Sequence, residues 1–264
     1  MTVTAREPDD DAIAAHGRLF PGGLSTLAAT DPELVGYFDG FAFGEVPRHT
    51  AGLPERTRLM AQLAATAAVG AVAGHRALLG AALTLGVTPV EAKEIVYQAV
   101  PYAGMARVLD VLHATNDVLA ERGVDLPLPG QSTTTPATRA ADGLAVQRRI
   151  VGEERVAAMH ADAPADLRHI QELLSANCFG DHYTRTGIDV PTRELLTLAM
   201  LAALGGADAQ VRGHVAANLR VGNDRSTLIA VLTALLPFIG YPRTLNALAA
   251  VDDIAPAPSA GEEA

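Results

Sequence analysis

An internal repeat constrains the fold of this chain more than any other feature. The stretch Thr192–His214 reads TRELLTLAMLAALGGADAQVRGH, and Thr57–His75 reads TRLMAQLAATAAVGAVAGH. The two Thr-Arg pairs lie 135 positions apart, and the motifs that begin with Pro101 and Pro237 (PYAG and PFIG) lie 136 positions apart. Because the register holds within about one residue, we interpret the chain as a tandem duplication of one unit.

The composition favours helices and restricts the kinds of partner. Apolar residues make up 49% of the 264 residues, aromatic residues only 4%, and tryptophan is absent. A core of Ala, Leu, Val and Ile suits closely packed helices, and alanine has the highest helix propensity. The net charge is −10, without a long run of Lys and Arg. Nucleic-acid binding needs a basic surface, so we do not expect it.

The sequence also bears on compartment and metal content. No apolar run reaches the roughly 18 residues that cross a bilayer, and the first residues lack the apolar core of a signal peptide. The single cysteine, Cys178, excludes a disulfide framework and a cysteine-based metal site. No His and carboxylate set has persuasive metal-ligand spacing, and no glycine-rich loop follows a strand. We expect a cytoplasmic protein with a small-molecule substrate, no metal, no cofactor, and no membrane or nucleic-acid partner.

Helix signals fill the chain, and no stretch is typical of a strand. We predict units at 12–122 and 139–254, a linker rich in Pro, Gly, Ser and Thr at 123–138, and disorder at 1–11 and 255–264. Capping and breaking residues predict helices over 11–20, 32–43, 54–69, a stretch around His75, 89–100, 105–122, 140–160, 165–179, 192–204, a stretch around His214, 224–235 and 242–254. We expect turns at Pro101–Gly104 and Pro237–Gly240 and a loop at Gly180–Tyr183.

Each unit resembles the carboxymuconolactone decarboxylase and alkylhydroperoxidase-D-like superfamily. In the second unit the resemblance rests on Phe179-Gly180-Asp181, the stretch Thr192–Gly205, and His214 eight positions before Gly222. In the first unit it rests on Phe43-Gly44-Glu45, Thr57-Arg58, Leu85–Pro89, Glu94-Ile95 and Tyr102-Ala103-Gly104. The resemblance covers nearly the whole chain apart from linker and tails. It implies an all-α fold of two tandem helical units, sites near subunit interfaces, and a homo-oligomer, either a trimer that forms a pseudo-hexamer or a dimer.

The peroxidase branch of this superfamily needs a Cys-x-x-Cys pair before the histidine. A thiolate must attack the peroxide, and a second thiol must resolve the product. Counted back from His214, the two cysteine positions hold Ala207 and Gln210, and in the first unit they hold Ala71 and Gly74. We therefore do not expect thiol peroxidase activity.

The decarboxylase branch implies acid–base chemistry without a cofactor, and the second unit has a match for each group. His214 would act as the acid or base, since imidazole titrates near neutral pH. Arg193 would hold a substrate carboxylate or enolate with its fork of donors. Asp181 or Glu194 would orient the histidine or move a proton. His182 and Tyr183 belong to the same loop as Asp181 and could complete a polar pocket.

Structural roles stay open for these residues. Arg193 and Glu194 open a helix, where a glutamate can serve only the helix dipole. His214 could be a satisfied core histidine on a helix rich in small apolar residues. Residues 181–183 could form a solvated loop.

The first unit departs from the pattern. Leu78 occupies the position that matches His214, and His75 lies three positions earlier, rotated by about 60° on a helix. Candidate substrate-binding residues remain in this unit: Glu45, His49, Arg58, His75 and Tyr102. The unit could be structural, could use His75 for another substrate, or could lend residues to a composite site. We favour a structural or supporting role.

We therefore expect a lyase or isomerase that acts on a small organic acid, lactone or polyketide-like molecule by proton transfer at carbon. The reaction would be a decarboxylation, isomerisation, dehydration or cyclisation, and its place would be in specialised metabolism. The alternative is a non-catalytic binding or scaffold protein that kept the fold and lost the site. The two differ in whether Arg193, His214 and a carboxylate converge on one closed pocket.

Overall fold

The computed structural model describes residues 10–20 and 27–257. These residues form helices and connecting segments, with no strand among them. The first half contains α1 (Asp10–Leu19), α2 (Leu27–Thr30), α3 (Pro32–Asp39), α4 (Val46–Arg48), α5 (Glu55–Val69), α6 (Val72–Thr84), α7 (Pro89–Ala103) and α8 (Met105–Glu121). The second half contains α9 (Arg139–Val151), α10 (Glu153–Ala161), α11 (Arg168–Leu173), α12 (Val190–Leu204), α13 (Asp208–Arg220), α14 (Arg225–Ile239) and α15 (Tyr241–Ile254). Two further segments are π-helical, η1 (Gly40–Glu45) and η2 (Leu174–Tyr183).

The duplication predicted from the sequence is confirmed, and so is the all-α fold. Helices α5 and α12 have 15 residues each, α6 and α13 have 13 each, and α7 and α14 have 15 each. A π-helical segment precedes the first helix of this series in both halves. The same order of elements therefore occurs twice.

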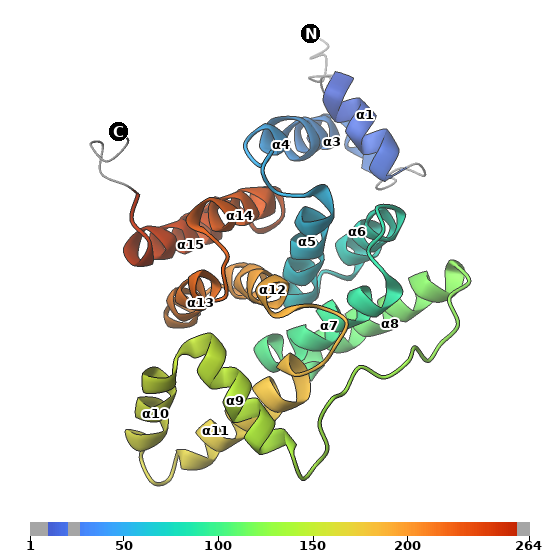
Figure 1. Ribbon diagram of the computed structural model, residues 1–264. Coiled ribbons are helices and arrows are strands. Elements are labelled where there is room, and N and C mark those ends of the chain that lie inside the picture. Colours follow the sequence, from blue (N-terminus) through green and yellow to red (C-terminus); the bar gives the residue numbers. More distant parts are fainter. Residues whose placement is uncertain (1–9, 21–26, 258–264) are drawn as a thin grey trace.

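The two halves interlock through their longest buried helices. Helix α5 packs along α12 in the middle of the molecule, α12 also contacts α7, and α5 also contacts α14 (Figure 1). Gln98 on α7 donates from Nε2 to the carbonyl of Arg193 on α12, at 2.8 Å. Gln62 on α5 donates in the same way to the carbonyl of Ala234 on α14, at 3.0 Å. Each half therefore completes the surroundings of the other half's central helix.

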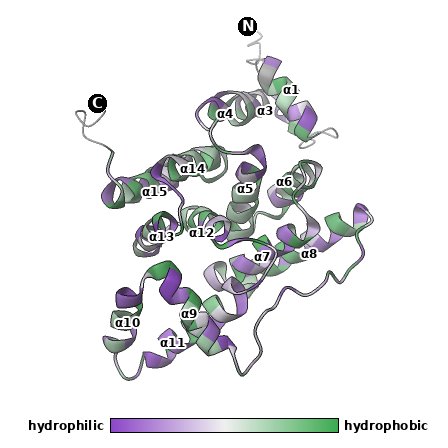
Figure 2. Ribbon diagram, in the orientation of Figure 1, coloured by the Kyte–Doolittle hydropathy of each residue, from purple (hydrophilic) through white to green (hydrophobic). Residues whose placement is uncertain are grey.

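The hydrophobic core follows from this arrangement. Figure 2 shows α12 and α14 coloured mainly as hydrophobic, whereas α9 and α10 alternate between hydrophobic and hydrophilic residues. In α12, Leu196, Leu198 and Met200 are fully buried. A helix that is apolar around its circumference belongs inside a protein, and an amphipathic one belongs on its surface. Helices α9 and α10 accordingly lie on the outside.

The two predicted turns begin later than the prolines that were expected to open them. Pro101 and Pro237 lie inside α7 and α14, which continue to Ala103 and Ile239. A proline removes its own N–H from the helix, and its ring crowds the carbonyl four residues earlier, but a packed helix can absorb both effects in its last turn. The helices end at Gly104 and Gly240, whose φ angles of 82° and 79° suit glycine.

The second half also differs from the sequence prediction at two places. The helix predicted over 140–160 is divided at Gly152, whose φ of 107° ends α9. The loop predicted at Gly180–Tyr183 is instead the end of η2. A π-helix has more residues per turn than an α-helix, so a search for the 3.6-residue period does not reveal it.

Helix α9 crosses η2 at very short range. A Cβ atom at Gly143 would lie 2.0 Å from the carbonyl oxygen of Ser175, and one at Gly180 would lie 2.1 Å from that of Arg139. Only glycine allows the two backbones to approach this closely. The crossing fixes the part of η2 that carries Cys178 and Tyr183.

The segment between α8 and α9 contains no helix and passes along the outside of the molecule (Figure 1). It is bound to the second half, because the amide of Thr186 donates to the carbonyl of Gln131 at 3.0 Å. Thr134 likewise donates from Oγ1 to the carbonyl of Gly180 at 3.1 Å. Most of the disorder predicted for the two chain ends falls on 1–9 and 258–264, outside the described residues, whereas Asp10 already belongs to α1.

Candidate active site

The sequence positions Glu194 inside the protein. Asp189 caps α12 by accepting a hydrogen bond from the amide of Thr192 at 2.8 Å, and Pro191 lies in the first turn. This start sets the rotation of a helix that is buried along most of its length, and it places the Glu194 side chain in the interior with no exposed surface. A buried carboxylate is costly unless hydrogen-bond donors surround it, so its partners define the site.

His214 on α13 is the first of these partners. Its Nδ1 lies 2.8 Å from Oε2 of Glu194, and its side chain is 16% exposed. With Glu194 ionised its oxygens can only accept, so this contact favours the tautomer with the proton on Nδ1 and a lone pair on Nε2. Asn218, one turn further along α13, donates to the carbonyl of Glu194 at 3.0 Å and fixes the two helices relative to each other.

A chain of hydroxyl groups reaches the other oxygen of the carboxylate. Tyr183 donates to Oε1 of Glu194 at 2.7 Å, and the hydroxyl of Tyr102 lies 3.0 Å from that of Tyr183. The ring of Tyr102 also packs edge-on against the imidazole of His214, with centroids 5.8 Å apart. Tyr102 belongs to α7 in the first half, so the site is built from both units.

Burial keeps the neighbouring acidic groups protonated. It raises the pKa of Tyr102 and of Tyr183 well above the ordinary value of 10, and the negative charge of Glu194 acts in the same direction. Burial also raises the pKa of the Cys178 thiol to about 12. A thiol with such a pKa is a poor nucleophile at neutral pH, in keeping with the absence of a second cysteine from the chain.

His214 opens on a large cavity. The cavity has a volume of about 1250 Å³ and lies between α7, α8, α9, α10, η2, α12 and α13. Tyr102, Cys178 and His214 form part of its wall, and the apolar residues around them include Val151, Met159, Leu174, Phe179, Leu201 and Leu204. The position of His214 in this wall lets Nε2 meet a bound molecule.

Three arginines also line this cavity, namely Arg107, Arg155 and Arg220. None of the ion pairs among the described residues includes any of them. Of the two glutamates in the same wall, Glu153 pairs with Arg148, 3.2 Å away. Guanidinium groups without a carboxylate partner are suited to bind a substrate carboxylate. Sequence reasoning missed these arginines, because no motif or spacing distinguishes them from surface arginines.

Arg193 is placed differently from the sequence prediction. Its side chain is 1% exposed and does not line the cavity. The guanidinium binds Oε2 of Glu94 at 2.8 Å, Oε1 of Gln98 at 2.9 Å and three backbone carbonyls. With its donors committed to α7 and to the segment before α12, Arg193 holds the two units together and is not placed to hold a substrate carboxylate.

Asp181 and His182 also lie away from the cavity wall. Asp181 accepts from Nε of Arg139 at 2.7 Å and pairs with a second nitrogen of that guanidinium, which lowers the pKa of Asp181. Burial lowers the pKa of His182. Of the two carboxylates proposed to orient His214, the structure therefore brings Glu194 to it and leaves Asp181 on Arg139.

Most candidates of the first half lie outside the site. Glu45, His49 and Arg58 do not line the cavity, and Arg58 pairs with Glu55 at 2.7 Å. His75 is 1% exposed, and its ring nitrogens face the hydroxyls of Thr66 at 3.3 Å and Thr115 at 3.1 Å. Burial lowers the pKa of His75 to about 4, so it is a neutral core residue. It is not placed to bind a substrate.

The position equivalent to the site in the first half is apolar. Leu59, Leu78 and Phe238 occupy the places that correspond to Glu194, His214 and Tyr102. Leu59 and Leu78 are buried, and the ring of Phe238 packs edge-on against that of Phe38 at 5.8 Å. Among the three roles considered for the first unit, the position of Tyr102 agrees with a supporting role in a composite site.

The described residues contain no group of three or more His, Cys, Asp and Glu side chains that could hold a metal ion. None of their helices has the length and apolar character needed to pass through a bilayer.

These features define a class: an all-α protein of two fused units with one histidine–glutamate site at their junction. The chain belongs to the carboxymuconolactone decarboxylase family, whose sequence pattern matches residues 32–117 and 168–253. No curated protein matches the chain. Helices α9 and α10 lie between the two matched ranges, although they contribute to the cavity wall.

Proposed function

We propose that this protein is an acid–base enzyme that moves a proton at a carbon atom of a carboxylate-bearing, largely apolar substrate. The observation that carries this proposal is the contact of 2.8 Å between His214 Nδ1 and the buried Glu194, on an imidazole that faces a cavity. Decarboxylation, isomerisation, dehydration and cyclisation all need such a proton transfer.

Each residue has a role that follows from its position. Nε2 of His214 removes a proton from an acidic carbon and returns it at a later step. Glu194 is a positioning residue that fixes the ring tautomer and stabilises the imidazolium formed during the transfer. Tyr183 and Tyr102 orient this carboxylate through their hydroxyls. The His214 ring and the Glu194 carboxylate therefore act together in the proton transfer.

The cavity supports the substrate class. A volume of about 1250 Å³ exceeds what a small aliphatic acid fills and suits an aromatic or polycyclic, polyketide-like molecule. The apolar residues of α9, α12 and η2 would contact its body, and Arg107, Arg155 and Arg220 would bind its carboxylate. Because α9 and α10 lie outside the matched ranges, we expect them to set substrate preference.

The test is hydrogen exchange at carbon in D2O, followed by NMR, over a panel of aromatic β-keto acids and lactones. We expect wild-type protein to accelerate exchange of the acidic C–H in at least one compound. His214→Gln should lower that rate by about 10²–10⁴-fold. Glu194→Gln should lower kcat by about 10–100-fold with little change in KM, because Glu194 does not line the cavity. His113→Gln, on the exposed face of α8, is the matched control.

A different outcome would favour the non-catalytic alternative. Compounds that raise the Tm of the wild type but not of Arg155→Gln, without any exchange at carbon, would show a binding protein that uses the same cavity. Exchange that survives His214→Gln would disprove the proposed mechanism.

A further inference from the structure

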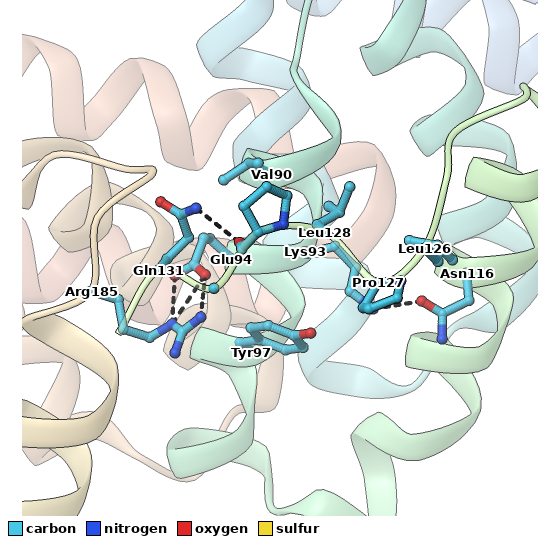
Figure 3. A pocket seen from close by; sticks show the side chains of 12 residues that line it. Val90, Lys93, Glu94, Tyr97, Asn116, Leu126, Pro127, Leu128, Gln131 and Arg185 are labelled. Carbon is cyan, nitrogen blue, oxygen red and sulfur yellow. Dashed lines mark hydrogen bonds and ion pairs between the residues drawn. The ribbon is translucent and has the colours of Figure 1, made fainter. Parts of the chain in front are cut away.

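A second pocket lies along the N-terminal and middle part of α7 and shares no residue with the His214 cavity, which meets α7 at its C-terminal end. It has a volume of about 320 Å³ and is enclosed by α7, α8, Arg185 and the segment 126–131 that joins the two halves. Figure 3 shows this segment passing over α7, with the ring of Tyr97 between Arg185 and Lys93. The pocket is therefore bounded by both units and by the connection between them.

Lys93 is the feature that distinguishes this pocket. It is the only lysine in the chain, in which the other 19 of the 20 basic residues are arginines. The residue as a whole is 9% exposed, its ammonium group is partly buried at the pocket, and Nζ donates to Oδ1 of Asn116. In the part of the chain that the structure describes, no carboxylate lies within ion-pair distance of Nζ, and burial lowers the pKa of this ammonium group. A partly buried ammonium group without a counter-ion is suited to bind an anion that enters the pocket.

The neighbouring charged side chains do not neutralise the ammonium group of Lys93. Glu94 also lines the pocket, but Arg185 binds both of its oxygens, at 3.0 and 2.8 Å, and Arg193 binds Oε2 at 2.8 Å. Lys93 Nζ and Arg185 Cζ lie 5.2 and 5.3 Å from the centre of the Tyr97 ring. Glu94 is thus shared by two guanidinium groups, and the Lys93 ammonium group has no ion-pair partner among the described residues.

Apart from the charged groups, Asn116 and Gln131, the side chains of the wall are mainly apolar. Val90 on α7 and the segment residues Leu126, Pro127, Leu128 and Pro129 line it. An ammonium group at one side and aliphatic side chains at the other match a molecule with an anionic end and an apolar body. A lone inorganic anion would satisfy the charge but would leave these apolar contacts unmade.

We propose that this pocket is a binding site for a small organic monocarboxylate, held by the Lys93 ammonium group and Asn116, with its apolar body against Val90 and residues 126–129. The site is separate from the His214 cavity and does not depend on the function proposed there. Its ligand would contact α7 and the connecting segment at the same time, and would therefore stabilise their contact.

The single lysine makes a direct test possible. Protein labelled with [13Cε]lysine gives one lysine resonance, which we would follow by NMR during titration with sodium benzoate and sodium hexanoate. We expect a saturable shift with either carboxylate. The neutral amides, benzamide and hexanamide, should bind at least about tenfold more weakly, because they lack the charge that pairs with Nζ.

Variants and anions complete the test. Lys93→Met keeps the length of the side chain and should abolish binding of benzoate measured by calorimetry, whereas Arg76→Met, at a paired surface arginine on α6, should not. If Lys93→Met does not fold, the NMR titration of the wild-type protein still tests whether carboxylates bind at Lys93. Three results would overturn the proposal: no saturable shift, equal binding of carboxylates and amides, or binding of inorganic phosphate as strong as that of benzoate.

Discussion

At the scale of single residues, burial and partners decide what a polar side chain does. Arg193 and Glu194 are neighbours on α12, and both are buried. Arg193 is neutralised by Glu94 across the unit boundary, whereas Glu194 faces a histidine that opens on a cavity. Their sequence context is the same. Only their surroundings in the folded protein show that Arg193 holds the two units together and that Glu194 positions His214.

The sequence could indicate some of these roles and not others. His214 and Glu194 were predicted candidates, and the structure brings them together with Tyr183 and Tyr102. The sequence could not separate Glu194 from Asp181, since both lie near the motif and only tertiary contacts assign Asp181 to Arg139. It could not predict the cavity arginines either, because Arg107, Arg155 and Arg220 lie on α8, α10 and α13 and come together only when these helices pack.

His75 gives a prediction for stability against pH. Burial lowers its pKa from 6.5 to about 4 in the folded protein. Between these values the unfolded chain binds a proton that the folded protein does not, so stability falls as the pH drops through this range. From about pH 7 to about pH 4.5, urea denaturation should show that wild type loses about 2–3 kcal/mol more than His75→Leu. Parallel losses in the two proteins would contradict this account.

At the scale of elements, the regular helices were predictable and the irregular ones were not. Helix α12 follows the capping residue Asp189, and α7 follows the capping box formed by Thr88 and Glu91. The π-helical segments escaped prediction because neither a cap nor a period marks them. Segment η2 nevertheless carries Cys178 and Tyr183 into the site. An element that the sequence does not reveal therefore forms part of the site.

The crossing of α9 over η2 gives the prediction at this scale. A methyl group at Gly180 would lie 2.1 Å from the carbonyl oxygen of Arg139, which is backbone and cannot move aside alone. We expect Gly180→Ala to lower the free energy of unfolding by about 3 kcal/mol or more, measured by urea denaturation. Gly52→Ala, where no atom lies within 4 Å of the added Cβ, is the matched control and should change stability by less than about 0.5 kcal/mol. Similar effects of the two changes would refute the close crossing.

At the scale of the whole molecule, duplication has produced one site instead of two. The junction of α12 with α7 carries the polar network, whereas the equivalent junction of α5 with α14 is filled by apolar side chains such as Leu59 and Phe238. The sequence revealed the repeat and the loss of the aligned histidine. It could not show that the two units interlock, because that depends on packing between positions roughly a hundred residues apart.

This interlocking predicts that the two halves unfold together, and the chain offers a way to test it. Cys178 is the only thiol, is buried, and lies in the second half. Leu79 is fully buried on α6, which packs against α5 and α8 of the first half. Leu79→Ala should cost about 2–5 kcal/mol and lower the urea midpoint by about 1 M. Because α5 and α12 share one core, we expect the midpoint for maleimide labelling of Cys178 to fall by the same amount as the midpoint for loss of helical circular dichroism.

A matched control and a clear alternative make this test decisive. Leu245→Ala removes a leucine that is 59% exposed on α15, and it should leave both midpoints in place. If the halves were independent domains, Leu79→Ala would split the circular dichroism transition into two steps and would leave labelling of Cys178 unchanged. Since α12 finds its buried surroundings in both α5 and α7, loss of the first half would expose the apolar face of α12, and the second half alone would lack the Tyr102 side of its site.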